Sequence, residues 1–160
     1  MGTRGKRSDE PLFLVEDYEI DKPLRDLENF ERLRNADQPV GQISFEDEQI
    51  YEAPTVRAFD RDWQLTLGVV QDRIYKIALF RSSRDRNQAR LDMFAVFGVC
   101  KSLYGQPTDD DGLIAVWDAE DGNVVVQTNA INPQGEAREY FVHVFLTSRR
   151  VRNFRVRSHV

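Results

Sequence analysis

Apolar and polar residues alternate in two stretches near the middle of the chain. Every second position of residues 63–69 is apolar, starting with Trp63, and residues 74–79 repeat this pattern after Gln71 and Asp72. A period of two is typical of a strand with one buried face. Because Gln71 and Asp72 read as a turn, the two stretches are predicted to form a β-hairpin.

The spacing of apolar residues then changes to three and four, which predicts a helix at about 86–104. Asp85, with Gln88 three residues later, resembles a capping box at the start of this helix. Gly105 stands where a left-handed cap belongs, and Pro107 follows it. The predicted apolar face consists of Met93, Val96, Phe97, Cys100, Leu103 and Tyr104.

Three more strands are predicted after the helix, at 113–117, 124–131 and 138–147. A loop at Asp109–Gly112 precedes them, and the Asp121-Gly122 dipeptide favours a tight hairpin between the first two. From residue 63 the order is therefore β-β-α-β-β-β. These connections predict an antiparallel sheet with one main helix packed on one face, an α+β fold.

The N-terminal part of the chain has a weaker pattern. Pro23 is followed by apolar residues at three-residue steps, which predicts a shorter helix at about 23–35. Residues 1–10 carry charges and small side chains and are predicted to be a disordered arm. A chain of 160 residues is the size of one domain, so residues 11–160 are predicted to form a single α+β unit.

The predicted strand around residues 140–146 is apolar on both of its alternating faces. Tyr140, Val142 and Val144 share one face, and Phe141 and His143 share the other. A strand of this kind is normally covered on both sides. We therefore expect a second element, either the 23–35 helix or a partner protein, to cover the face opposite the main helix.

Charge is distributed unevenly, although the net charge is only −5. Residues 9–62 contain 16 acidic and 6 basic residues, whereas residues 63–160 contain 11 acidic and 13 basic residues. The acidic first part could pair with the basic tail of the same chain, or the basic tail could contact a partner. The sequence leaves both possibilities open.

The basic tail carries the candidate partner-binding residues. Phe154 and Val156 alternate with Arg155 and Arg157, so residues 149–157 are predicted to form an edge strand with its arginines outward. Charged side chains on an edge strand also prevent aggregation, which is a competing explanation. The candidate set is Arg149, Arg150, Arg152, Arg155 and Arg157.

No arrangement of residues points to catalysis, a metal or a cofactor. His143 lies between two valines, which favours a structural histidine over a general base. Cys100 shares an apolar helix face, which favours a buried thiol over a nucleophile. The acidic loops lack the ligand spacing of a calcium site. If a pocket exists between helix and sheet, its predicted lining is Trp63, Tyr75, Trp117, Tyr140 and His143.

The leading hypothesis is a non-catalytic domain that binds another protein through an apolar sheet face or the arginine-rich edge. The alternative is a small-ligand binder, or an enzyme, with a pocket between helix and sheet. Nucleic-acid binding through the arginines is weaker, because the acidic first part would repel phosphate. No apolar run is long enough to span a membrane. With a single cysteine and no secretory pattern, the expected location is the cytoplasm.

Overall fold

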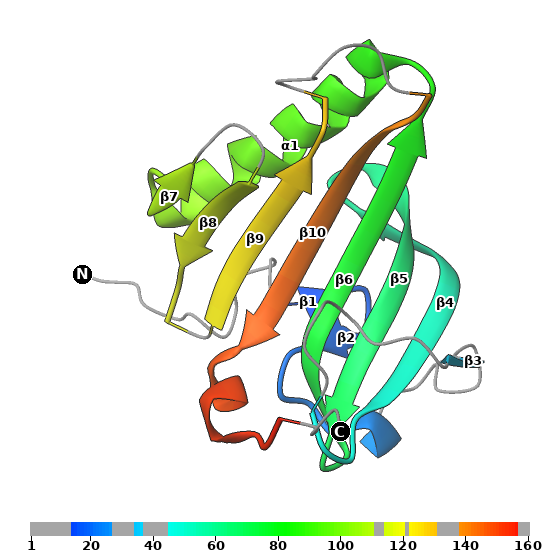
Figure 1. The fold of residues 1–160 in the computed structure, drawn as a ribbon, viewed down its shortest axis with the longest axis vertical. Coiled ribbons are helices and arrows are strands. Elements are labelled where there is room, and N and C mark those ends of the chain that lie inside the picture. The colour runs from blue at the N-terminus through cyan, green and yellow to red at the C-terminus, as the bar shows by residue number, and fades with distance from the viewer. Residues whose placement is uncertain are drawn as a thin grey trace.

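The computed structural model describes residues 14–26, 34–36, 45–110, 114–120, 122–130 and 138–156. Within these residues one antiparallel sheet contains eight strands in the order β3-β4-β5-β6-β10-β9-β8-β7. A long helix, α1, crosses one face of this sheet (Figure 1). The strands β1 (Leu14–Val15) and β2 (Tyr18–Glu19) form a separate small pair. The predicted α+β class is confirmed.

The described elements follow the predicted order from residue 63 onward. Helix α1 spans Arg86–Tyr104, and β5-β6-α1-β8-β9-β10 confirms the β-β-α-β-β-β arrangement. The predicted loop after α1 also contributes a short edge strand, β7. The sheet strands are β3 (Arg34–Ala36), β4 (Gln49–Ala58), β5 (Arg61–Val70), β6 (Arg73–Ser83), β7 (Asp109–Asp110), β8 (Ile114–Asp118), β9 (Gly122–Thr128) and β10 (Tyr140–Ser148).

Two tight hairpins connect β4, β5 and β6. Gln71 and Asp72, which join β5 to β6, have φ values of 56° and 64°. Phe59 and Asp60, which join β4 to β5, have φ values of 53° and 61°. Two consecutive residues at positive φ match the right-handed twist of paired strands, so both connections close without splaying the sheet.

The ends of α1 are capped at the predicted residues. The Asp85 side chain accepts a hydrogen bond from the backbone N–H of Asn87 (2.9 Å). Gly105 has a φ of 83°, and its N–H donates to the carbonyl of Lys101 (3.0 Å). Gln88 does not complete the capping box, because its amide donates to Asp92 instead (3.1 Å). Among the described residues, no helix combines the length and the apolar character that crossing a membrane requires.

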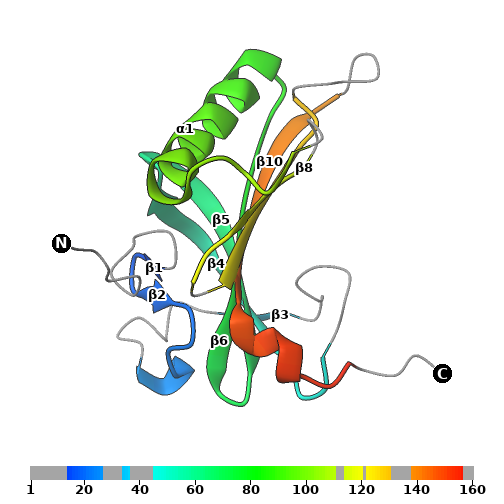
Figure 2. The ribbon, with the colours of Figure 1, turned by 90° about the vertical axis from the view of Figure 1, so that its left-hand side faces the viewer.

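The main core lies between α1 and the sheet. Val96 and Cys100 of α1 are fully buried there with strand residues such as Leu67. Tyr18 and Leu24 belong to the same core, so the N-terminal segment packs on the α1 face of the sheet. Figure 2 shows α1 and β1–β2 on one side of the sheet, with the C-terminal helical turn on the other. One of our expectations was that the 23–35 helix covers the second face of the sheet. The described N-terminal residues do not cover that face, because they pack on the α1 side.

The predicted N-terminal helix is present in the described residues as one 3-10 turn, η3 (Leu24–Asp26). The N–H of Leu24 donates to the carbonyl of Asp72 (2.8 Å), which ties this turn to the β5–β6 hairpin. At the predicted helix end, Arg34–Ala36 pairs with β4 as strand β3, so the prediction is wrong there. The edge of β4 has backbone N–H and C=O groups that need hydrogen-bond partners, and Arg34–Ala36 supplies them. The helical spacing of apolar residues in the sequence does not indicate this pairing. Residues 27–33 and the predicted arm at 1–10 lie outside the described residues.

The predicted C-terminal edge strand is wrong. Residues Arg149–Asn153 form a 3-10 helix, η5, which begins where the Ser148 hydroxyl accepts the N–H of Arg150 (3.0 Å). Val156 makes one isolated bridge to Phe45 but is 57% exposed rather than inward. The cap at Ser148 turns the chain before the alternation that follows can extend the sheet.

Candidate functional site

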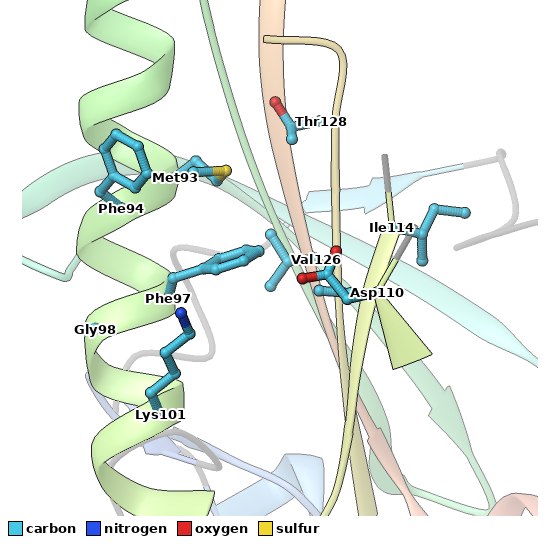
Figure 3. Close-up of a pocket in the computed structure, with 10 residues that line it drawn as sticks. Met93, Phe94, Phe97, Gly98, Lys101, Asp110, Ile114, Val126 and Thr128 are labelled. Carbon is cyan, nitrogen blue, oxygen red and sulfur yellow. The ribbon is translucent and has the colours of Figure 1, made fainter. Parts of the chain in front are cut away.

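A groove lies between α1 and the strands β7, β8 and β9 (Figure 3). Its volume is about 410 Å³. The helix wall consists of Met93, Phe94, Phe97, Gly98 and Lys101, and the strand wall consists of Asp110, Ile114, Ala115, Val126 and Thr128. Most of these side chains are apolar, so the groove is a place where water is easily displaced.

Helical spacing places the groove residues of α1 beside its core-facing stripe. Met93, Val96 and Cys100 recur at intervals of three and four and are buried against the sheet. Phe97 and Lys101 each lie one residue further on, which turns them about 100° around the helix axis. One side of α1 is therefore committed to the core, and the adjacent side forms the wall of the groove.

Phe97 is the groove side chain that packs against the sheet. Its ring extends from α1 toward Val126 (Figure 3). It packs edge-on against Trp117, with ring centroids 5.2 Å apart and an interplanar angle of 89°. The Trp117 indole N–H donates to the carbonyl of Gly105 (2.9 Å), which fixes the ring that Phe97 rests on. These contacts hold Phe97 in place between helix and sheet.

The strand wall offers few polar groups. Ala115 and Val126 are paired across β8 and β9, and both are buried. The Thr128 hydroxyl accepts the N–H of Ala130 (3.0 Å) and donates to the carbonyl of Phe141 (2.7 Å). The hydroxyl of Thr128 thus both accepts and donates a hydrogen bond inside the fold. Apart from its β7 edge, the strand wall therefore presents an apolar surface to the groove.

Exposed apolar side chains continue from the groove onto the surface of α1. Phe94 is 51% exposed and Leu91, three residues earlier, is 56% exposed. Ile114, on the opposite wall, is 37% exposed. Single exposed apolar side chains are ordinary, but a group beside an apolar groove marks a candidate interaction surface.

Gly98 keeps the helix wall of the groove open. It is exposed in the interior of α1, and no atom apart from its chain neighbours and the adjacent helix backbone lies within 4 Å of the position that a Cβ would occupy. Neither packing nor backbone conformation therefore requires glycine here. A glycine in a helix interior costs about 1 kcal/mol relative to alanine, so the residue lowers helix stability and widens the groove.

The other side of α1 is held to the sheet by buried charges. Asp92 is 1% exposed, and its carboxylate accepts hydrogen bonds from the Nε atoms of Arg61 (2.6 Å) and Arg81 (3.0 Å). Arg81 also lies over the ring of Trp63, 5.7 Å from its centroid. These two arginines connect α1 to β5 and β6, on the side away from the groove.

Three of the five predicted pocket residues lie on the α1 side of the sheet. Trp63 and Trp117 are both buried, and the Trp63 indole donates to the carbonyl of Ala58 (2.8 Å). Tyr140 belongs to a separate small cluster with Ala89 of α1 and with Ala130, which follows β9. Although Trp117 supports Phe97, none of the three lines the groove.

Tyr75 lies at the opposite end of the molecule. Its ring packs edge-on against Phe45 and Phe154, with centroid distances of 5.4 and 5.5 Å. Its hydroxyl donates to a carboxylate oxygen of Glu48. Burial, together with the neighbouring Glu48 carboxylate, raises the pKa of this hydroxyl well above its usual range. Tyr75 is therefore a core residue of the second sheet face.

His143 lies on the sheet face opposite α1, within an aromatic row formed by Phe80, Phe141, His143 and Phe145. Its ring is 5.1 Å from that of Phe80 and 4.2 Å from that of Phe145. Burial, and to a smaller extent the charge of Lys76, lowers the pKa of His143. The structure therefore does not bring the five predicted pocket residues together.

The basic tail is partly engaged inside the molecule. The guanidinium of Arg149 donates to the carbonyls of Glu120 (2.7 Å) and Ala119. Arg150 pairs with Asp21 at 3.4 Å. Arg152 and Arg155 are exposed, and Arg157 lies outside the described residues. The five arginines therefore do not form the row of exposed charges that an edge strand would present.

The described residues bear on two kinds of chemistry, a cysteine nucleophile and a metal site. Cys100 is fully buried, as predicted, and burial raises the pKa of its thiol to about 12. A thiol with that pKa is protonated at neutral pH and is a poor nucleophile. Within the described ranges, no group of three or more His, Cys, Asp or Glu side chains is arranged to hold a metal ion.

The groove residues Phe94, Gly98 and Ile114 were not identified from the sequence. The available signal was Phe94, an aromatic residue outside the apolar face predicted for the helix. Comparisons with protein-family models, curated proteins and solved structures found no match for this chain.

Proposed function

We propose that this protein is a non-catalytic binding domain whose groove beside α1 takes an apolar segment of another protein. One observation carries the proposal. The groove is continuous with half-exposed Phe94 and Leu91 on the outer side of the helix. A group of exposed apolar side chains next to a concave site marks a candidate protein-binding surface.

The extent of the apolar surface favours a protein over a small molecule. A molecule that fills the groove contacts Phe94 and Phe97, but Leu91 does not line the groove. Leu91 would remain 56% exposed after such binding. A peptide segment lying along α1 covers Leu91 as well, and therefore removes more apolar surface from water.

The groove is also a better candidate than the two surfaces expected from the sequence. In the aromatic row, Phe80 and His143 are half-buried and pack on each other, so less of their surface is left for a partner. In the basic tail, Arg149 and Arg150 already bond to groups of the same chain. Phe94 is half-exposed and is not among the residues packed on the main core.

The chain offers a sensitive reporter for this proposal. It contains two methionines, Met1 and Met93, and Met93 lines the groove. With ¹³C-methyl methionine labelling, NMR titration follows these methyl groups directly. The probe is an uncharged amphipathic peptide with leucine on one face and glutamine on the other. We expect the Met93 methyl signal to shift saturably while the Met1 signal stays constant.

Gly98 provides a matched pair of variants. Gly98→Leu places a side chain in the open space of the groove, whereas Gly98→Ala improves the helix without filling it. Gly98→Leu should abolish the peptide-induced shift, and Gly98→Ala should retain it. The proposal is overturned if the peptide does not shift Met93 in the native protein, or if both variants bind it as the native protein does.

A second candidate, a small apolar ligand, is favoured by the groove volume of about 410 Å³. Drug-sized ligands usually occupy sites of roughly 300–1,000 Å³. The same Met93 reporter distinguishes the two candidates, with a neutral medium-chain alcohol as the small probe. Saturable binding of the alcohol but not of the peptide would favour the small ligand.

A further inference from the structure

The ridge of α1 that carries the aromatic residues of the groove has a basic residue at each end, of which Lys101 lines the groove and Arg90 lies one turn beyond it. Arg90, Phe94, Phe97 and Lys101 follow one another at intervals of four, three and four, so they form one ridge along α1. Lys101 lies three turns after Arg90, roughly 16 Å along the helix axis. The ridge therefore presents two cations separated by two aromatic rings.

No acidic residue of α1 offsets these two charges. Asp92 is the one acid between Arg86 and Tyr104, and it is buried on the other side of the helix with Arg61 and Arg81. The ridge is therefore net positive at neutral pH, although the whole chain carries a charge of −5.

The strand wall has the opposite charge at one point. Asp110 of β7 lines the groove across from the helix, and Figure 3 shows it on the side opposite Lys101. Asp110 also interacts with other groups of the protein, so the net positive charge of the helix ridge decides the charge preference. Acidic groups of a bound segment are therefore favoured next to the helix.

We infer that the segment bound in the groove is acidic at both ends of an apolar stretch, with one carboxylate beside Arg90 and one beside Lys101. This inference rests on the proposed function, since it specifies the partner of the same groove. Its occupant is an amphipathic helical segment of another protein that lies along α1. Acids three turns apart on that segment match the separation of the two cations.

Three peptides of one apolar sequence test this inference. They carry glutamate, glutamine or lysine at the two positions three turns apart, and their affinities are measured by the Met93 methyl shift. The glutamate peptide should bind about tenfold more tightly than the glutamine peptide, and the lysine peptide more weakly than both. High salt should reduce the part of the difference that comes from Lys101, because that side chain is exposed.

Two double variants of equal net charge test whether the preference for the glutamate peptide arises at the groove. Replacement of Arg90 and Lys101 by glutamine should remove the preference for the glutamate peptide. Arg152 and Arg155, which are exposed at the other end of the molecule, provide the control when replaced in the same way. That control should keep the preference, since it changes the total charge but not the groove. Lys101→Gln alone, at an exposed site, should remove about half of the preference in free energy.

The outcomes separate the inference from the proposed function. If the three peptides bind equally and Gly98→Leu blocks all of them, the groove binds apolar segments and the inference is overturned. If the control variant loses the preference as fully as the groove variant, the effect comes from net charge and the inference is again overturned. If none of the peptides shifts Met93, the proposed function itself has failed.

Discussion

The two sides of α1 meet the same sheet in different ways. On the side of β5 and β6, buried Val96 and Cys100 reach the sheet, and Asp92 binds two arginines. On the side of β8 and β9, Phe97 reaches Trp117 and a groove of about 410 Å³ remains beside it. One helix is therefore closed onto the sheet along one side and open along the other.

The difference depends on side-chain size at a few positions. On the open side Gly98 and Ala115 contribute little volume, and Phe97 spans the space between helix and sheet as a single ring. On the closed side, the carboxylate of Asp92 and its arginines fill the interface and satisfy one another. A packed interface excludes ligands, whereas the incompletely filled interface beside Phe97 leaves room for a partner.

Thiol reactivity should differ most between the two sides. Cys100, on the closed side, is fully buried and should react with a thiol reagent only when the protein opens. Gly98→Cys, made in a Cys100→Ala background, places a thiol on the open side. We expect it to react more than about a thousandfold faster than native Cys100, measured by absorbance at neutral pH. Comparable rates would mean that the closed side opens readily.

The pH dependence of stability gives an independent check on Cys100. Its pKa is raised to about 12 in the folded protein, so the unfolded chain ionises first as pH increases. The unfolded state then binds fewer protons than the folded state, and the free energy of unfolding decreases above about pH 9. The free energy of unfolding of Cys100→Ala, measured by denaturation, should decrease less steeply with pH above about pH 9. If the free energies of the native protein and the variant decreased equally, the burial of the thiol would be contradicted.

Asp92→Ala should cause the largest loss of stability on the closed side. Removal of the carboxylate leaves the half-buried guanidinium groups of Arg61 and Arg81 without their shared partner. Breaking a buried ion pair from one side typically costs about 3–5 kcal/mol. Urea denaturation should show this loss, while Asp118→Ala, at an exposed site, should change stability by less than about 0.5 kcal/mol. Equal effects of the two would remove the distinction between the sides.

Gly98→Ala should have the smallest effect, and it should increase stability. Alanine adds a methyl group that meets no atom within 4 Å apart from its chain neighbours and the adjacent helix backbone, and it favours the helix by about 0.5–1 kcal/mol. Thermal unfolding measures the change, with Gly105→Ala as the opposite control. Gly105 has a φ of 83°, so alanine there should destabilise the protein. A loss of stability in Gly98→Ala would show that the groove wall cannot accept a side chain.

Helix α1 and the hairpins were predictable because their signals are local. The N-cap at Asp85 and the C-cap at Gly105 depend on residues within one turn, and both form hydrogen bonds in the structure. The alternation from Trp63 to Leu67 likewise corresponds to the two faces of β5, whereas Gly68, Val69 and Val70 are all buried beside a bulge. Strand length, caps and turn residues depend on neighbours along the chain, which the sequence displays directly.

The two wrong predictions involve distant contacts. The 3-10 helix η5 follows Ser148, whose hydroxyl also donates to Asp21 (2.7 Å), a residue far away in the sequence. Phe154 then packs on Phe45 and Tyr75 instead of extending the sheet. At the other end, Arg34–Ala36 pairs with β4 although the local spacing favours a helix. Tertiary hydrogen bonds and packing overrode local preference in both segments.

The sequence by itself determined the fold class, the limits of α1 and the burial of Cys100, because periodicity and capping act between near neighbours. Only the tertiary structure decided that Asp92 meets Arg61 and Arg81, and that α1 stands away from β8 and β9. The groove is lined by residues that are distant in sequence, such as Gly98 of α1 and Ala115 of β8. No pattern along the chain reports the space between elements, because that space depends on how all the side chains around it pack.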